Sequence, residues 1–497
     1  MSKLPRSSGV LLHPTSLPGP YGIGDIGPEA YRWIDTLEAA KQHWWQILPL
    51  GPTGYGNSPY QAFSAFAGDI TLLSPDLMIR DGLLPSDIGF GHQFRADVVD
   101  YDQVRSFKLH IVRKAYGQMQ DATSAQRQAF DDYCHREQHW LHDYAVFMAA
   151  RAAFARVPLS QWPTAIRTRE PAALQALEQE LAGEIQILKF GQYLFDQQWN
   201  ALRSYANSKN VKLIGDAPIF VAQDSADVWA NPGEFLLDEH GLPTAVAGVP
   251  PDYFSEDGQL WGNPLYDWDA MERTGFGWWL ARIHRQLEQV DLIRLDHFRG
   301  FAAAWHVPVG QTTARNGTWV PGPGAKLFHA LLGKLETLPF IAEDLGFITP
   351  DVNDLRTYFD LPGMRVLQFT LGEPSNIYWP HNYDINTVVY TGTHDNNTTV
   401  GWWGGLKSDD RTQLMHYIGK EISEPHWDVL RLAWASVAAI AIVPLQDWIG
   451  LGREARMNTP GIAEGNWAWR FQPDEFRDGL IQTLAEMTVR YSRDVPA

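Results

Sequence analysis

Short apolar runs recur along the chain, and each is long enough for one strand that is buried on both faces. Nearly continuous Val, Ile and Leu is typical of parallel sheets that helices cover on both sides. Eight segments fit this pattern: 9–13, 44–50, 211–216, 290–296, 338–344, 364–370, 387–393 and 438–447. The last of them could instead continue a buried helix, but Pro444 and the polar residues after it favour a strand that ends in a loop. Helical stretches separate most of these segments, so the pattern predicts an α/β fold, a (β/α)8 barrel.

Two gaps between the predicted strands are far longer than one helix requires. Residues 75–190 carry Leu and Ile at helix spacing, interrupted by three prolines, which predicts a mostly helical insertion. Residues 217–289 are rich in Gly, Pro, Asp and Tyr and are predicted to form loops over the active site. Only about 50 residues follow the last strand, too few for a C-terminal β-sandwich domain. We therefore expect residues 1–497 to form a single catalytic barrel with these two insertions.

Composition and charge narrow the classes of partner. The formal net charge of −18 argues against nucleic acid and against anionic membrane surfaces, and is compatible with a neutral polar substrate. The single cysteine, Cys134, rules out an internal disulfide and fits a reducing compartment. The amino terminus has no apolar core of a secretory signal, and the longest apolar stretch, 435–445, is too short to span a bilayer. These features predict a cytoplasmic location; protein partners cannot be assigned from them.

Three acidic residues, Asp296, Glu343 and Asp395, each follow one of the predicted strands. In a (β/α)8 barrel the carboxyl ends of the strands converge on one pocket. Like charges in one pocket raise each other's pKa, so such a group is costly unless chemistry requires it. Each acid could instead cap the helix that follows it. Three of them in the same position relative to their strands favour a catalytic group.

Paired carboxyl groups are what breaks a glycosidic bond, one as acid and the other as nucleophile or base. Arg294 lies two residues before Asp296 on the same strand face, and a guanidinium favours the ionised form that a nucleophile needs. Glu343 has the longer side chain, and the apolar run before it favours a raised pKa, as a general acid requires. Asp395, preceded by His394, could hydrogen-bond sugar hydroxyls and stabilise a distorted ring.

Two other kinds of site are possible at the same strand ends. A metal site would use a set drawn from His13, Asp216, Asp296, Glu343 and His394. The sequence has no closely spaced ligand pair, so we predict no metal and no cofactor. A phosphate-binding barrel needs a Gly-rich loop after strand seven or eight, and the loops that begin at 392 and 446 are weak matches.

The chain closely resembles the amylomaltases, which are the 4-α-glucanotransferases of glycoside hydrolase family 77 in the α-amylase-like clan. The resemblance covers nearly the whole chain and rests on eight segments. These are GVLLHPTSLPGPYGIGDIG (9–27), WWQILPLGPTGYGNSPYQAFSAFAG (44–68), GDAPIFVAQDSADVWANP (215–232), AGVPPDYFSEDGQLWGNPLYDW (247–268), RLDHFRGF (294–301), IAEDLG (341–346), YTGTHDNNT (390–398) and QDWIGLGREARMNTPGIAEGNWAWR (446–470).

The resemblance implies a retaining mechanism with Asp296 as nucleophile, Glu343 as general acid/base and Asp395 as stabiliser of the transition state. It places Arg294 and His394 in supporting positions around the reacting sugar. It further implies substrate contacts at Asp216, Ser58, Tyr60, Tyr253, Phe254, Trp261 and Asn263. Each aromatic residue in this set could instead belong to the core. The implied substrates are α-1,4-glucans and maltooligosaccharides.

The three acids alone do not distinguish transfer from hydrolysis. The segment 248–254 combines two stiffening prolines with an aromatic pair, which favours a lid that excludes water and so favours transfer to a sugar hydroxyl. Transfer within one long glucan would give cyclic products. The alternatives are an α-amylase-like retaining hydrolase and a starch- or glycogen-binding protein without catalysis. Retention predicts that the carboxyl groups of Asp296 and Glu343 lie ~5–5.5 Å apart.

Overall fold

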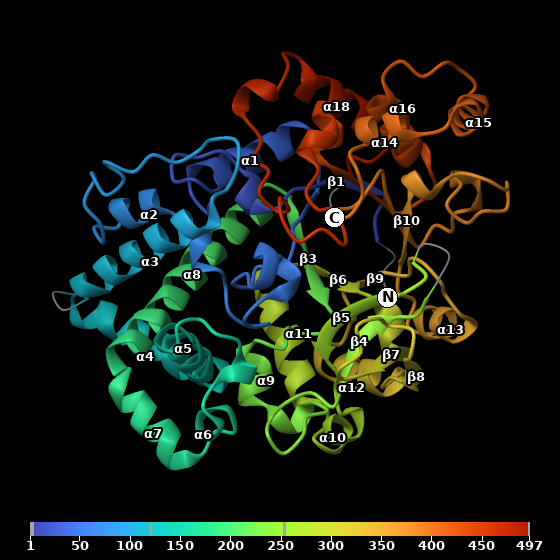
Figure 1. The fold of residues 1–497 in the computed structure, drawn as a ribbon. Coiled ribbons are helices and arrows are strands. Elements are labelled where there is room, and N and C mark those ends of the chain that lie inside the picture. Colours follow the sequence, from blue (N-terminus) through green and yellow to red (C-terminus); the bar gives the residue numbers. More distant parts are fainter. Residues whose placement is uncertain (1–3, 120–121, 252–254, 496–497) are drawn as a thin grey trace.

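The barrel is the centre of the molecule (Figure 1). The computed structural model describes residues 4–119, 122–251 and 255–495. Eight parallel strands close in the order β1-β12-β11-β10-β9-β6-β3-β2. They are β1 (Ser7–Leu11), β2 (Trp44–Gln46), β3 (Lys212–Pro218), β6 (Leu292–Asp296), β9 (Phe340–Ala342), β10 (Gly363–Val366), β11 (Thr387–Tyr390) and β12 (Ile440–Pro444). Each strand overlaps one predicted segment, so the (β/α)8 prediction is confirmed.

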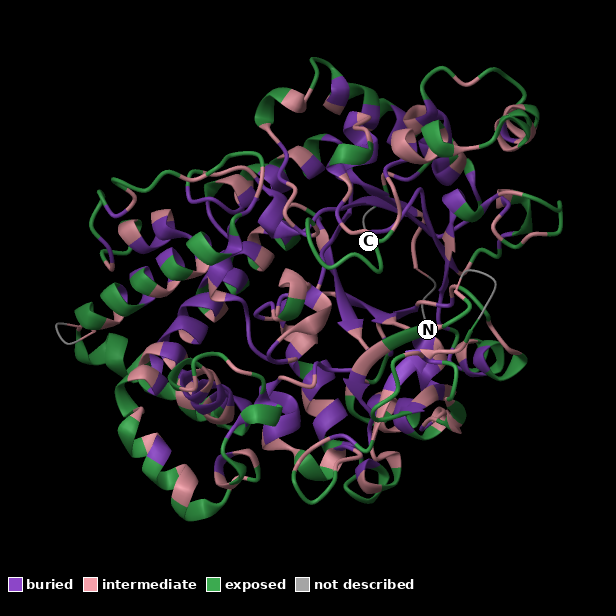
Figure 2. Ribbon diagram, in the orientation of Figure 1, coloured by how far each residue is buried: buried purple, intermediate pink, exposed green. Residues whose placement is uncertain are grey.

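Side chains alternate between the inside and the outside of the barrel, because successive residues of a strand point to opposite faces. The inside is filled by its own apolar cluster, with Leu11, Trp44, Ile214, Leu292, Ile341, Met364, Val388, Tyr390, Ile440 and Ile442 among its members. The neighbours that point outward, such as Leu213, Ile293 and Val389, belong to the larger core shared with the helices. Figure 2 shows the barrel strands among the most completely buried parts of the fold. Each fully buried aliphatic side chain contributes about 1.5–3 kcal/mol of hydrophobic stabilisation.

Helices follow seven of the eight strands and pack around the barrel. They are α1 (Pro28–Ala39), α8 (Ala182–Ser208), α11 (Gly277–Gln289), α12 (Ala325–Leu335), α13 (Pro350–Tyr358), α16 (Pro425–Ala435) and α18 (Leu480–Arg490). Three of them, α1, α13 and α16, begin with proline at the first position, where its fixed φ fits and its missing N–H costs nothing. The connection from β10 to β11 contains only the short 3-10 turns Leu367–Phe369 and Pro380–Asn382.

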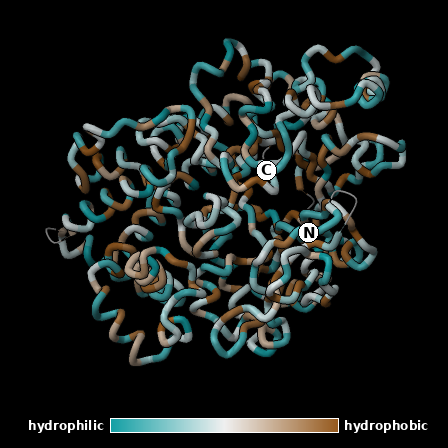
Figure 3. The backbone as a smooth tube through the Cα atoms, viewed as in Figure 1, coloured by the Kyte–Doolittle hydropathy of each residue, from teal (hydrophilic) through white to brown (hydrophobic). Residues whose placement is uncertain are grey.

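Helices also fill the long connection between β2 and β3. Residues 75–190 contain α2 (Pro75–Arg80), α3 (Tyr101–Gln118), α4 (Ser124–Arg136), α5 (Gln138–Ala153), α6 (Thr164–Arg167), α7 (Pro171–Glu180) and the first turns of α8. Figure 1 shows α3 to α7 grouped on one side of the barrel, and in Figure 3 hydrophobic and hydrophilic residues alternate over short stretches of these helices. Pro171 begins α7, and the apolar periodicity continues across the break at Leu181 into α8.

Residues 217–289 contain more regular structure than the loops we predicted. They include α9 (Ala226–Ala230), α10 (Trp268–Arg273) and α11, together with β4 (Ala245–Val249) and β5 (Gln259–Pro264). The two strands join β7 (Ala303–Pro308) and β8 (Thr318–Pro321) in an antiparallel sheet of order β5-β4-β7-β8. This sheet was missed because its strands have only four to six residues, and because two of them precede β6 in the chain and two follow it.

The eighth predicted strand was too long. Residues 440–444 form β12, but Leu445–Ile449 form the short helix α17. Pro444 ends the strand, and the chain turns into the helix at once. Asp447 consequently lies on a helix rather than on a strand. None of the helices within the described ranges has the length and apolarity needed to cross a membrane.

Candidate active site

Strand register brings the polar side chains together at the carboxyl end of the barrel. Asp216 on β3 lies opposite Arg294 on β6, and Pro218 lies opposite Asp296. On the other side of β6, Leu295 lies opposite Ala342, and the Glu343 amide donates to the Leu295 carbonyl (3.1 Å). Residues 216, 294 and 296 have the same parity as the inward-facing apolar residues, so all three point into the barrel mouth.

Arg294 connects two of the carboxylates. Its Nη1 lies 2.8 and 2.7 Å from the two Asp216 oxygens, and its Nη2 lies 2.8 Å from Asp296 Oδ1. Burial opposes the charge of Arg294, but the charges of Asp216 and Asp296 raise its pKa. The Asp216 side chain is fully buried, whereas 28% of the Asp296 side chain stays exposed. Arg294 therefore keeps its charge and holds Asp296 from the side, with part of that carboxylate open to a ligand.

The electrostatic environment of Glu343 differs from that of Asp296, which pairs with Arg294. Burial and the nearby charge of Asp296 raise its pKa to about 8, against the lowering effects of Arg294 and two backbone N–H donors. The donors are His297, 2.7 Å from Oε2, and Leu345, 3.1 Å from Oε1. His297 adopts a left-handed conformation with φ 52°, which directs its N–H at Glu343. Such strain is typical of functional sites.

Asp395 is held on the loop after β11, and 49% of its side chain is exposed. Asn458 donates to its Oδ1 (2.6 Å), and His394 Nε2 lies 3.3 Å from its Oδ2. Burial of the group raises the Asp395 pKa, but the charge and hydrogen bond of His394 and the Asn458 bond lower it below its usual range. Burial lowers the pKa of His394, and Asp395 raises it more. The pair therefore favours an ionised Asp395.

Tyr60 links this pair to the arginine-held carboxylates. Its hydroxyl donates to Asp216 (2.7 Å) and lies 3.2 Å from His394 Nδ1, and its ring stacks on His394 with centroids 4.8 Å apart. Trp467 packs against both rings at 5.8 Å. Ser58 accepts a hydrogen bond from the Tyr60 amide (3.2 Å) and caps the turn that presents Tyr60; its contact with substrate stays a prediction.

Two further predicted contact residues lie on β5. Trp261 is partly buried, and its ring meets the His297 ring edge to face at 4.7 Å. Asn263 is buried and donates to the Val221 carbonyl (2.9 Å), so its role in this structure is to hold the loop after β3. Tyr253 and Phe254 lie outside the described residues.

The residues considered above as an alternative metal site are not arranged as metal ligands. Within the described residues no group of three or more His, Cys, Asp or Glu side chains is arranged to hold a metal ion. His13 is buried, which lowers its pKa to about 3, and its Nδ1 accepts from the Leu48 amide (3.3 Å). Asp216 and Asp296 are both engaged by Arg294.

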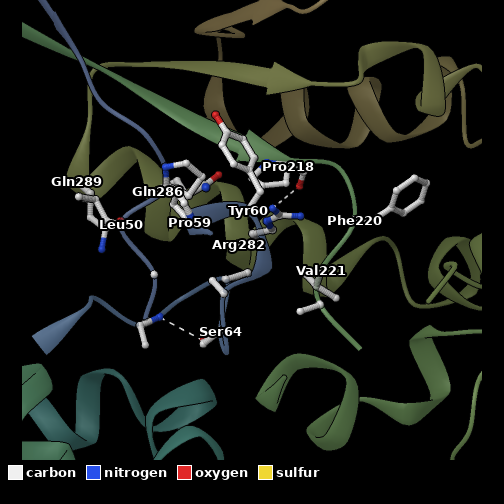
Figure 4. Close-up of a pocket in the computed structure, with 16 residues that line it drawn as sticks. Leu50, Pro59, Tyr60, Ser64, Pro218, Phe220, Val221, Arg282, Gln286 and Gln289 are labelled. Atoms are coloured by element: carbon white, nitrogen blue, oxygen red, sulfur yellow. Dashed lines mark hydrogen bonds between the residues drawn. The ribbon is translucent and has the colours of Figure 1, made fainter. Parts of the chain in front are cut away.

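A small pocket lies behind Tyr60 (Figure 4). Its volume of about 40 Å³ is enough for a water molecule or two but not for a sugar. Arg282 on α11 lines it and donates to the carbonyls of Pro218 (2.5 Å) and Ile219 (3.2 Å). Figure 4 shows the Tyr60 hydroxyl directed away from Arg282. None of the three acids lines this pocket. Its residues, Arg282 among them, support the chain where β3 ends.

Several residues of the site were missed at the level of sequence. His297 contributes only its backbone N–H, and Asn458 and Arg456 reach Asp395 from beyond the last barrel strand, Arg456 by donating to the Asp395 carbonyl (2.5 Å). Backbone donors leave no residue-type signal. The polar segment RMNTPG (456–461) lies in a matched motif and was the one available indication.

A (β/α)8 barrel that sets an arginine-held carboxylate near a carboxyl group of raised pKa has the arrangement of enzymes that act on glycosidic bonds. Comparison with known proteins gives the family. The chain belongs to the 4-alpha-glucanotransferase family, whose model matches residues 12–475. It is accordingly a transferase that acts on α-glucans.

Relatives match over nearly their full lengths. The 4-alpha-glucanotransferase of Synechocystis sp. is 48% identical over 99% of this chain and 98% of its own. That of Thermus thermophilus is 47% identical over 98% of this chain and 100% of its own. Among solved structures, the amylomaltase from Streptococcus agalactiae in complex with acarbose superposes with a TM-score of 0.95 at 39% identity, covering 98% of this chain and 99% of that one.

Proposed function

We propose that the chain transfers α-1,4-glucan segments by double displacement, with Asp296 as nucleophile, Glu343 as general acid/base and Asp395 as stabiliser of the transition state. The observation that carries this assignment is the contrast between two neighbouring carboxyl groups. Asp296 is paired with Arg294 at 2.8 Å, whereas burial and the Asp296 charge raise the Glu343 pKa to about 8. One acid is thus ready to attack and the other to donate a proton near neutral pH.

In the first step Glu343 gives its proton to the glycosidic oxygen while an Asp296 oxygen attacks the anomeric carbon. The bond from that carbon to the glycosidic oxygen breaks, the leaving glucan departs with the proton, and a glycosyl ester forms on Asp296. In the second step Glu343, now a carboxylate, takes the proton from the 4-hydroxyl of an acceptor sugar. The acceptor oxygen attacks the anomeric carbon and Asp296 leaves, so two inversions give net retention.

The remaining polar groups supply charge and orientation. Arg294 stabilises Asp296 both as attacking and as leaving group. Asp395, ionised and fixed by Asn458 and His394, is placed to hydrogen-bond sugar hydroxyls as positive charge develops at the anomeric carbon. Tyr60 and Trp261 would contact sugar rings. Acarbose, the ligand of the Streptococcus agalactiae amylomaltase, would bind at the barrel mouth beside the three acids.

Maltooligosaccharides and longer α-1,4-glucans are the proposed donors and acceptors. Transfer requires that an acceptor reach the glycosyl ester before water does. The sequence predicts that the segment 248–254 excludes water; the structure describes its first part, the end of β4 followed by Pro250 and Pro251, and residues 252–254 lie outside the described ranges. Long acceptors on the same chain would give cyclic products. The single cysteine, Cys134, supports a cytoplasmic location.

Incubation with maltotriose tests the proposed function. We expect glucose together with maltodextrins longer than maltotriose, because the enzyme-bound segment is passed to another sugar. Chromatography of the products against time is the measurement. Glucose and maltose in equal amounts, with no longer product, would instead identify a hydrolase. A run in H₂¹⁸O measures the hydrolytic leak directly, because only hydrolysis places ¹⁸O at the new reducing end.

A further inference from the structure

A buried carboxylate outside the pocket fastens the loop that carries Asp395. Asp447 lies on α17, directly after β12, and is 1% exposed. It touches none of the three catalytic acids. Burial raises its pKa more than the hydrogen bonds from Thr391 and Thr399 lower it, and within the described ranges it forms no ion pair with Lys, Arg or His. A carboxylate that is buried in this way must be compensated by its hydrogen-bond donors.

Those donors lie at the two ends of one loop. Thr391 directly follows β11, and its hydroxyl donates to Asp447 Oδ2 (2.6 Å). Thr399 is the first residue of α14 (Thr399–Gly405), and it donates twice, from its amide to Oδ1 (2.6 Å) and from its hydroxyl to Oδ2 (2.7 Å). Asp447 therefore joins the beginning and the end of the loop 391–399, which contains His394 and Asp395.

The interior of this loop is bonded to itself. The amide and hydroxyl of Thr393 both donate to Asn396 Oδ1 (2.9 Å each), and the Asp395 amide donates to the Thr393 hydroxyl (3.3 Å). Thr393, Asp395 and Asn396 thus form a compact turn. Asn458 and Arg456 hold Asp395 from outside the loop, and the two ends that Asp447 joins supply a second attachment of this turn.

We propose that Asp447 is a positioning residue for the transfer reaction, and that it acts through Asp395 by fixing both ends of the loop 391–399. The inference rests on the proposed role of Asp395. A carboxylate suits this task because it accepts hydrogen bonds only and can take all three donors at once. An amide in its place accepts on one side alone, and its NH₂ group would force the threonine hydroxyls to turn their protons away.

The first test is Asp447→Asn, assayed by disproportionation of maltotriose. A displacement of the loop by a fraction of an ångström to 1 Å lowers kcat by on the order of 10-fold to 100-fold. We expect the KM for maltotriose and the Kd of acarbose to stay within about threefold, since Trp261 lies on β5 and Tyr60 keeps its hydrogen bond to Asp216 on β3, both outside this loop. The matched control is Asp428→Asn, which removes another buried carboxylate; Asp428 lies on α16 and pairs with Arg431 on the same helix and with Lys420 before it. The control should lower the melting temperature and leave kcat unchanged.

The second test separates positioning from general stability. In an Asp395→Asn background, Asp447→Asn should cause little further loss of the residual rate, measured with a glucosyl fluoride donor. Thr391→Val should reproduce part of the kcat loss, and Thr391→Ser, which restores the hydroxyl, should recover it. Losses that multiply in the double variant, or a kcat loss in Asp447→Asn that follows the melting temperature as in the control, would overturn the proposal. If Asp395→Asn alone keeps full turnover, the role of Asp395 itself is wrong.

Discussion

Asp296→Asn is expected to lower kcat by on the order of 10⁴-fold to 10⁶-fold while the affinity for glucans stays nearly unchanged. The amide has no anionic oxygen to form the glycosyl ester, so the first displacement cannot take place. Arg294 would still hold Asp216 through two hydrogen bonds, which keeps the floor of the pocket in place. Turnover is measured with maltotriose, and affinity with acarbose by calorimetry.

A matched control for this variant lies at the other end of the same strand, β6. Asp291→Asn also removes a carboxylate near β6, but at the opposite end of the barrel, where Asp291 pairs with Arg203 at 2.7 Å. That variant should keep its kcat. Loss of glucan binding in Asp296→Asn with turnover preserved would show that Asp296 binds substrate and that the nucleophile is another residue.

Glu343→Gln is expected to lower kcat for maltotriose by about 10²-fold to 10⁴-fold, the usual contribution of a general acid. The loss should be much smaller for formation of the glycosyl ester from a glucosyl fluoride, whose leaving group needs no proton. In the wild type, kcat/KM for maltotriose should fall as the pH rises through about 8, where Glu343 loses its proton. The variant should lack this fall. A variant that loses both donors equally would argue that Glu343 acts in binding rather than in proton transfer.

The same carboxyl group links pH to stability. The folded-state pKa of Glu343 lies at about 8, above the ordinary value of 4.5, so the folded protein holds this proton more tightly than the unfolded chain. Its stabilising contribution is complete below pH about 4.5 and is lost as the pH rises to about 8. Glutamine imitates the protonated form at every pH. The melting temperature of Glu343→Gln, relative to that of the wild type, should therefore rise as the pH increases across this interval. The measurement is calorimetry at matched ionic strength.

The barrel could be predicted from the sequence because its strands are buried on both faces. In segments such as VDLIRLD (290–296) the residues that pack inside and outside the barrel, Leu292, Ile293 and Leu295, must be apolar, and this constraint is local to the strand. The same logic placed Asp296 and Glu343 at strand ends. The pairing of Arg294 with Asp296 followed from their spacing of two, and the structure gives 2.8 Å between them.

The parts that were not predictable depend on register between distant strands. Whether Arg294 also reaches Asp216 depends on how β3 lies beside β6, which no local pattern encodes. Ser58 and Asn263 illustrate a related difficulty. Both lie in motifs of the family and each is bonded to backbone in the structure, so the motif alone does not separate contact with substrate from support of a loop, and their substrate contacts stay predictions.

Asn458 reaches Asp395 from beyond β12, the strand that closes the barrel. During translation the three acids are all synthesised before this partner, which follows Asp395 by 63 residues. A nascent chain that ends before residue 440 lacks both β12, which closes the barrel, and Asn458, which holds Asp395. Its catalytic acids are present, but the active site is incomplete. The active site is therefore complete only when the residues beyond β12 have been synthesised and have folded.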